Sequence, residues 1–206
     1  MTELILHEYA ASRNCYKIRL ALAHIGRSYE RREYDILKGE TRTPRFLATV
    51  NANGRIPVLQ VGSNFLPESN AALWFLAEGT DLLPDGAFGR ADVLRWLFWE
   101  QYNHEPNIAT LRFWRTYGGG FDEQSPARQA TIPDKQAAGE AALKLMDDHL
   151  AGRAWFVGDR LSIADIALYA YTHVAADGGF ALEPYRHLRA WLERVAAQPG
   201  HVTITG

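Results

Sequence analysis

The residues best suited to chemistry in this sequence lie in a short polar segment, Ser12 to Cys15. This segment follows a predicted strand at residues 4–8 and leads into a predicted helix at residues 15–25. A helix N-terminus presents backbone N–H groups and the positive end of the helix dipole, which stabilise an anion such as a thiolate. Cys15 is the single cysteine, which excludes a dithiol mechanism within the chain. The thiol would therefore arrive with a substrate, unless Ser12 is only a helix cap and Cys15 a buried helical residue.

A second candidate is the pair Ile56-Pro57 at the start of a predicted strand, residues 56–61. Proline lacks the N–H that a central strand needs, so it belongs at a strand start or in a special turn. A cis bond before Pro57 would turn the backbone N–H and C=O of Ile56 outward, where they can pair with a peptide-like ligand. A trans proline on an edge strand is the competing interpretation.

The third candidate is Glu68-Ser69, directly before a run of helix-forming residues. At a helix N-terminus, Glu68 can take an ammonium group, while Ser69 and the backbone N–H groups take a carboxylate. These are the two charged groups of an α-amino acid. The competing interpretation is an ordinary helix cap.

Elements that can position these candidates alternate between strands and helices over residues 1–78, in the order β-α-β-α-β-β-α. The predicted strands are 4–8, 29–36, 56–61 and 65–66, and the predicted helices are 15–25, 44–50 and 68–77. Residues 79–89 are rich in turn formers and are predicted to be a linker. The remainder, residues 90–206, is predicted to be all-helical, with helices at 90–117 and 127–150, one that begins at Ser162, and one at 184–197.

The composition and charge of the chain argue against several kinds of partner and site. With 206 residues, of which 47% are hydrophobic, the chain can bury a sizeable core. Its 22 basic and 24 acidic residues give a net charge of −2, which argues against a nucleic-acid partner. No apolar run reaches the roughly 18 residues of a membrane span, and residues 1–14 lack a charged segment followed by a long apolar stretch. We therefore expect no membrane partner and a cytoplasmic location. The seven histidines lack ligand spacing and there is one cysteine, so no metal site is predicted.

Four segments of the sequence resemble, in order, the motifs of cytosolic glutathione transferases: S-R-N-C-Y-K-I-R-L-A-L, N-A-N-G-R-I-P-V-L, P-E-S-N-A-A-L and F-V-G-D-R-L-S-I-A-D. The first is similar to the serine-type loop of the theta, zeta and delta classes and their bacterial relatives. In the second, Ala52 replaces the usual proline. The resemblance implies an α/β thioredoxin-like N-terminal domain at 1–78, a linker at 79–89 and an all-α C-terminal helical domain at 90–206, usually assembled as a homodimer.

The resemblance also implies roles around the sulfur of glutathione, the expected cosubstrate. By position, Ser12 matches the serine whose hydroxyl hydrogen-bonds the sulfur. Asn14 is an alternative partner, since some bacterial relatives use an asparagine of this loop. Cys15 is a third candidate, because cysteine-type classes form a mixed disulfide. Its match to the cysteine that follows the serine in theta and delta relatives argues against that role.

The rest of glutathione is assigned in the same way. Ile56, before a cis Pro57, matches the residue that pairs with the cysteinyl backbone. Glu68 and Ser69 match the residues that bind the γ-glutamyl group. Arg55 matches a basic position near the glycyl carboxylate, and Thr41 matches a neighbour of that position.

The expected reaction is attack of the glutathione thiolate on a small hydrophobic electrophile. Candidates for an apolar wall that holds the electrophile are aromatic: Tyr9, Tyr102, Phe113, Trp114 and Tyr117. Aromatic side chains on a long helix are also common core residues. The alternatives for the activity are a glutathione-dependent isomerase, a disulfide reductase or dehalogenase, and a noncatalytic transferase-like binding module.

Overall fold

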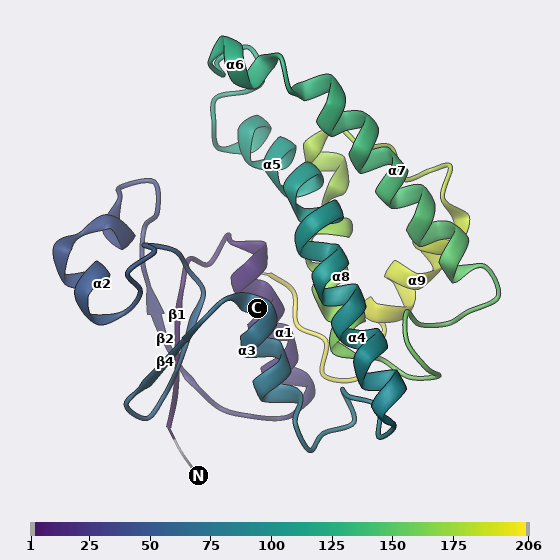
Figure 1. Cartoon of the computed structure of the whole chain (residues 1–206), viewed down its shortest axis with the longest axis horizontal. Coiled ribbons are helices and arrows are strands. Elements are labelled where there is room, and N and C mark those ends of the chain that lie inside the picture. Colours follow the sequence, from purple (N-terminus) through teal and green to yellow (C-terminus); the bar gives the residue numbers. More distant parts are fainter. Residues whose placement is uncertain (1–2, 205–206) are drawn as a thin grey trace. The chain divides into compact units, whose positions relative to one another are not determined.

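The computed structural model describes residues 3–204 and divides into two compact units (Figure 1). Of the described residues, the first unit comprises 3–81 together with 198–204, and the second comprises 82–197. Residues 198–204 therefore belong to the first unit and not to the helical one. Each unit is described below by itself.

The first unit is built on a four-stranded sheet with the strand order β2-β1-β3-β4. The strands are β1 (Leu4–Glu8), β2 (Glu30–Glu33), β3 (Val58–Val61) and β4 (Asn64–Pro67). β1 is parallel to β2 and antiparallel to β3, and β3 is antiparallel to β4. All four predicted strands are present. β2 ends before the predicted residue 36 because the carboxylate of Asp35 accepts the N–H groups of Leu37 and Lys38 and so forms a turn.

Three α-helices accompany this sheet: α1 (Arg13–His24), α2 (Pro44–Thr49) and α3 (Ser69–Ala77). A short 3₁₀ turn, η1 (Glu40–Arg42), precedes α2. Helices α1 and α3 pack against each other on one face of the sheet, and α2 lies on the other side (Figure 1). Helix α1 begins two residues before the predicted start because Ser12 caps it by accepting the N–H of Cys15.

The second unit is all-helical. Its elements are α4 (Ala87–Trp99), the π-helical turn η2 (Glu100–His104), α5 (Glu105–Thr116), α6 (Pro126–Gln129), α7 (Ile132–Leu150), α8 (Ile163–Thr172), the 3₁₀ turn η3 (Ala175–Gly178) and α9 (Arg186–Ala196). The single helix predicted over 90–117 is present as one continuous helical run from Ala87 to Thr116, in which η2 is a π-helical turn between α4 and α5. Pro106 has no N–H to continue the hydrogen-bond ladder, so the ladder changes in the preceding turn.

The helix predicted over 127–150 is divided into α6 and α7. Pro133 is the cause, because proline fits only the first turn of a helix, where its missing N–H is not needed. A new helix must therefore start just before Pro133.

The core of the second unit surrounds α8, all ten residues of which are buried. Asp165 stands in the first turn of α8, and its carboxylate accepts the N–H groups of Phe156 and Ser162 at 3.0 Å each. It also accepts the Ser162 hydroxyl at 2.8 Å and the Trp191 indole N–H at 2.9 Å. This buried capping box fixes where α8 begins and ties it to α9. In the part of the chain that the structure describes, no helix is both long and apolar enough to cross a membrane.

Candidate functional site

The strand register brings the three predicted motifs to one end of the sheet. His7 in β1 lies opposite Val58 in β3, and Val58 lies opposite Pro67 in β4. The loop after β1, the bond before β3 and the residue after β4 therefore leave the sheet at the same end. Each of these segments carries one of the candidate groups.

Ser12 stands at the N-cap of α1 in an extended conformation and is half-buried. Its side-chain oxygen accepts the N–H of Cys15 at 3.4 Å, and its own N–H donates to the carbonyl of Tyr9 at 2.8 Å. Capping uses one acceptor position of the hydroxyl, and the O–H can rotate toward another partner. A serine in this place can serve as a cap and still donate a hydrogen bond to an anion at the helix end.

Cys15 is completely buried one turn further along α1. Burial raises the pKa of its thiol to about 12, and hydrogen bonds from the Ser12 side chain and the Tyr9 N–H oppose this rise only in part. The group is therefore a protonated thiol near neutral pH, and a thiol is a poor nucleophile. This geometry supports the interpretation of Cys15 as a buried helical residue.

Asn14 and Ser69 connect the N-termini of α1 and α3. The Ser69 hydroxyl donates to Oδ1 of Asn14 at 3.2 Å. The Nζ atom of Lys17, a side chain with no exposed surface, lies 3.5 Å from Ser69 Oγ and 3.5 Å from Asn70 Oδ1. Lys17 was not among the predicted site residues, although its position three residues after Asn14 places both on the same side of the helix.

Glu68 occupies the N-cap position of α3 with φ 69° and ψ 113°. A non-glycine residue rarely adopts a positive φ, and such a conformation costs roughly 1–3 kcal/mol and is concentrated at functional sites. Within the described structure its side chain makes no capping bond to α3, and it is exposed. The carboxylate is therefore available at a helix N-terminus, beside Ser69.

The Ile56–Pro57 peptide bond is cis, as the resemblance implies. Arg55, just before it, is exposed, and its carbonyl accepts the side-chain N–H of Asn51 at 3.0 Å. The turn that carries Arg55 packs against η1. A Cβ on Gly54 would lie 3.0 Å from the carbonyl of Thr41, so only glycine, at φ 63°, permits this approach. The Thr41 side chain is buried.

Comparison with known proteins agrees with this arrangement. The N-terminal domain of glutathione S-transferase matches residues 2–78, and the C-terminal domain of glutathione S-transferase matches residues 113–199. Glutathione S-transferase 3 of Zea mays is 32% identical over 211 residues, which cover 97% of this chain and 91% of that protein. The crystal structure of a glutathione S-transferase from Pseudomonas fluorescens is 44% identical, with a TM-score of 0.92, and covers 98% of this chain and 99% of that one. The chain belongs to the glutathione S-transferase family.

A further relative is the maleylacetoacetate isomerase of Rhizobium meliloti, which is 32% identical over 171 residues, 81% of this chain and 78% of that protein. The predicted fold class, a thioredoxin-like domain followed by an all-helical one, is confirmed. The prediction of a glutathione transferase is confirmed as well. Between residues 3 and 204, no group of three or more His, Cys, Asp or Glu side chains is arranged to hold a metal ion.

The aromatic residues expected to line an electrophile pocket of this glutathione S-transferase differ in their surroundings. In the second unit, Phe113 lies in the last turn of α5 and Tyr117 is the C-cap residue of this helix, and the centres of their rings are 5.8 Å apart. Trp114 is buried, and the Arg128 guanidinium lies 5.6 Å from its ring. Tyr102, in η2, is 85% exposed. The structure therefore pairs Phe113 with Tyr117, while Trp114 belongs to the core of that unit. Tyr9, in the first unit, is half-buried in the loop before Ser12.

Proposed function

We propose that this protein is a serine-type glutathione transferase, similar to the theta and zeta classes, in which Ser12 stabilises the thiolate of bound glutathione. The observation that carries the proposal is the pair formed by Ser12 and Cys15 at the start of α1. Ser12 is half-buried at the helix end, whereas the neighbouring thiol is buried, with its pKa raised to about 12. Of these two side chains, only the hydroxyl suits contact with a ligand.

The chemical step follows from this geometry. The thiol of glutathione releases its proton to solvent, and the sulfur anion accepts a hydrogen bond from the Ser12 hydroxyl at the positive end of α1. The thiolate then attacks an electrophilic carbon, forming a carbon–sulfur bond while a leaving group departs with its electron pair or a double bond takes up a proton. Asn14 is a second candidate donor to the sulfur, although its Oδ1 is directed at Ser69.

The peptide part of glutathione is proposed to lie across the same end of the sheet. Glu68 pairs with the γ-glutamyl ammonium, and Ser69 with the first N–H groups of α3 takes the carboxylate. The backbone of Ile56, before cis Pro57, pairs with the cysteinyl unit. Arg55 attracts the glycyl carboxylate, with Thr41 in the turn that supports it.

The substrate class is proposed to be small hydrophobic electrophiles, with the Phe113–Tyr117 pair as part of an apolar wall. A glutathione-dependent isomerisation is the second candidate, because an isomerase is among the relatives at 32% identity. Both reactions need the same thiolate, so they differ in the electrophile and not in the site around Ser12.

The experiment that tests the proposal combines calorimetric binding of glutathione with steady-state turnover of an aryl halide, maleylacetoacetate and a panel of small disulfides. We expect glutathione to bind at millimolar concentration or below and the aryl halide to be conjugated. Turnover of maleylacetoacetate alone would favour the isomerase, and turnover of the disulfides alone would favour a reductase. Binding without turnover of any of them would contradict the proposal.

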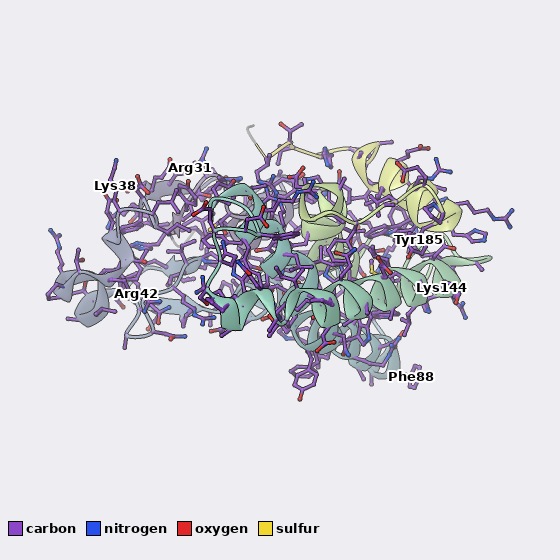
Figure 2. The ribbon with its side chains drawn as sticks, turned by 90° about the horizontal axis from the view of Figure 1, so that it is seen from above. Arg31, Lys38, Arg42, Phe88, Lys144 and Tyr185 are labelled. Atoms are coloured by element: carbon purple, nitrogen blue, oxygen red, sulfur yellow. The ribbon has the colours of Figure 1, made fainter. Side chains whose placement is uncertain are left out.

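We also propose that the protein is a cytoplasmic homodimer, and that a second copy covers the aromatic face of α4 and η2. Phe88, Phe98 and Tyr102 are 86%, 70% and 85% exposed and fall within a quarter-turn of one another at helical spacing. Figure 2 shows Phe88 projecting away from the ribbon. Exposed aromatic side chains in such a group are typical of an interface. Sedimentation should show a dimer that Phe98→Asp weakens; a monomer of the wild type at micromolar concentration would contradict this.

A further inference from the structure

Residues 199–204 are held along helix α1 of the first unit, where Figure 1 draws them in yellow. The Tyr16 hydroxyl donates to the carbonyl of Val202 at 2.7 Å. The Arg19 guanidinium donates to the carbonyl of Ile204 at 2.8 Å. Both side chains lie on α1, and both are buried. Residues 199–204 therefore cover part of α1, the helix that Ser12 caps.

Arg19 is the residue through which this segment reaches the site. Only 1% of its surface is exposed. Its Nη1 donates to Oε2 of Glu8 at 2.7 Å, and its Nη2 donates to the carbonyls of Ala10 and Ile204 at 2.9 and 2.8 Å. Glu8 is the last residue of β1, and Ala10 lies in the loop that leads to Ser12. One guanidinium thus joins the strand, the site loop and the 199–204 segment.

Other contacts of the site loop are made mostly within residues 9–15. The Tyr9 carbonyl accepts the Ser12 N–H at 2.8 Å, the Ala11 carbonyl accepts from Arg13 at 3.0 Å, and the Tyr9 N–H donates to Cys15 Sγ at 3.5 Å. The N–H of Ala10 donates to the exposed carboxylate of Glu33 at 3.2 Å, a contact open to solvent. The bond from Arg19 to the Ala10 carbonyl is buried on the Arg19 side, where it is stronger. The same Nη2 atom serves Ala10 and Ile204, so loss of the Ile204 carbonyl lets the guanidinium turn or draw water in. Either change would weaken the bond to Ala10, which lies in the loop that leads to Ser12.

We propose that Arg19 and the Ile204 carbonyl are positioning groups for catalysis, which hold the loop of residues 9–12 so that Ser12 meets the glutathione sulfur. This inference rests on the proposed role of Ser12. The peptide part of glutathione is assigned to α3 and to the backbone before β3, which Arg19 does not touch. Loss of the segment therefore raises the pKa of the bound thiol and lowers the rate, while the affinity for glutathione changes little.

The test compares two shortened chains. One ends after His201 and lacks the Val202 and Ile204 carbonyls, which accept from Tyr16 and Arg19, while the bonds from Arg19 to Glu8 and Ala10 remain possible. Its matched control ends after Ile204 and keeps both, with a terminal carboxylate oxygen in place of the Ile204 carbonyl. For each we would measure the pH profile of kcat/KM with an aryl halide, the ultraviolet absorbance of bound thiolate, the KM for glutathione and the melting temperature.

For the chain that ends at His201, we expect the pKa of the bound thiol to rise by about half a unit to one unit, and kcat/KM below that pKa to fall by about 3- to 10-fold. KM for glutathione should stay within about twofold, and the control should match the full chain. An unchanged pH profile in a folded chain ending at His201 would overturn the inference. A parallel rise in KM with no shift in the profile would do the same.

Arg19→Lys in the full chain covers the case in which the shortened chain does not fold. Lysine keeps the charge that faces Glu8 but cannot reach both Ala10 and Ile204, so the same shift is expected. An unshifted profile for this variant would overturn the inference as well. Ser12→Ala separates the two proposals: if it shifts the profile and Arg19→Lys does not, only the positioning role fails. If Ser12→Ala has no effect, the proposed function fails.

Discussion

The helices of both units have polar capping side chains at their N-termini. These side chains differ in how many hydrogen bonds they make to the protein. At α8, the buried carboxylate of Asp165 accepts four hydrogen bonds, from Phe156, Ser162 and Trp191. At α1, the half-buried hydroxyl of Ser12 accepts one backbone N–H and lies in hydrogen-bond contact with the Cys15 thiol. At α3, the side chain of Glu68 is exposed and, within the described residues, makes no capping bond.

This difference in hydrogen bonding distinguishes a helix N-terminus that stabilises the fold from one that can bind a ligand. A helix end whose polar groups all have protein partners holds the fold together and has nothing to offer a ligand. An end whose capping side chain is open can exchange water for an anion or an ammonium group. On this comparison, changes at α8 should alter stability, and changes at α1 and α3 should alter binding or rate.

The largest effect is expected at Asp165. Asp165→Ala leaves the Phe156 N–H, the Ser162 N–H and the Trp191 indole buried without their acceptor, which should lower the free energy of unfolding by about 3–5 kcal/mol. Urea denaturation measures this change. Asp148→Ala, on the exposed face of α7, is the matched control and should leave stability near that of the wild type. A small effect of Asp165→Ala would show that α8 does not depend on its cap.

The next effect is expected at Ser12. Ser12→Ala removes a donor to the charged sulfur, worth about 1.5–3 kcal/mol, so the pKa of bound glutathione should rise by about one to two units. Near neutral pH this corresponds to a roughly 10- to 150-fold loss in kcat/KM, with little change in glutathione affinity. The pH profile and the absorbance of the bound thiolate measure it. Asn14→Ala is the comparison variant, and a larger shift from it would transfer the role to Asn14.

The candidate site residues at the ends of helices and strands could be predicted from short stretches of sequence. Ser12, Pro57 and Glu68 are visible in the sequence because a cap, a strand start and a turn each depend on a few neighbouring residues. The π-helical turn η2 and the start of α7 depend on Pro106 and Pro133, which are equally local signals.

The buried side chains that contact the site residues could not be predicted from short stretches of sequence. Lys17 and Arg19 are charged, yet both are among the nine buried residues of this twelve-residue helix. Their partners are distant in sequence: Ser69 is 52 residues from Lys17, and Ile204 is 185 residues from Arg19. Helical periodicity describes one face of a helix, whereas the sheet, α3 and the 199–204 segment cover α1 on several sides.

A smaller effect is expected at Glu68. Glu68→Gln removes the charge that faces the glutathione ammonium and should raise KM by about tenfold with kcat nearly unchanged, since the contact is equal in the ground and transition states. Glu68→Gly removes the same charge and also suits the positive φ, so it should bind as poorly while remaining at least as stable as Glu68→Gln. Isothermal calorimetry and thermal denaturation measure the two effects. Unchanged binding in both variants would remove Glu68 from the site.

The smallest effect on activity is expected at Cys15, although Ser12, where a large effect is expected, is only three residues away. Cys15→Ala should keep turnover within a few-fold, because the thiol is buried and its pKa is raised to about 12. In the wild type, iodoacetamide should react slowly with this thiol near neutral pH and quickly once urea unfolds the chain. Loss of activity in Cys15→Ala, with Ser12→Ala still active, would reverse the assignment of the two residues and indicate a mixed-disulfide mechanism.

The dependence of stability on pH also tests whether Cys15, unlike Ser12, is buried away from a ligand. Because the folded pKa of Cys15 lies above the ordinary thiol value of 9.0, the folded state binds the thiol proton more tightly than the unfolded state does. This contribution to stability is complete below about pH 9 and is lost as the pH rises toward 12. Wild type should therefore lose more stability than Cys15→Ala between about pH 8 and pH 11, as measured by urea denaturation. Equal losses would place the thiol in contact with solvent, where it could compete with Ser12 for the ligand.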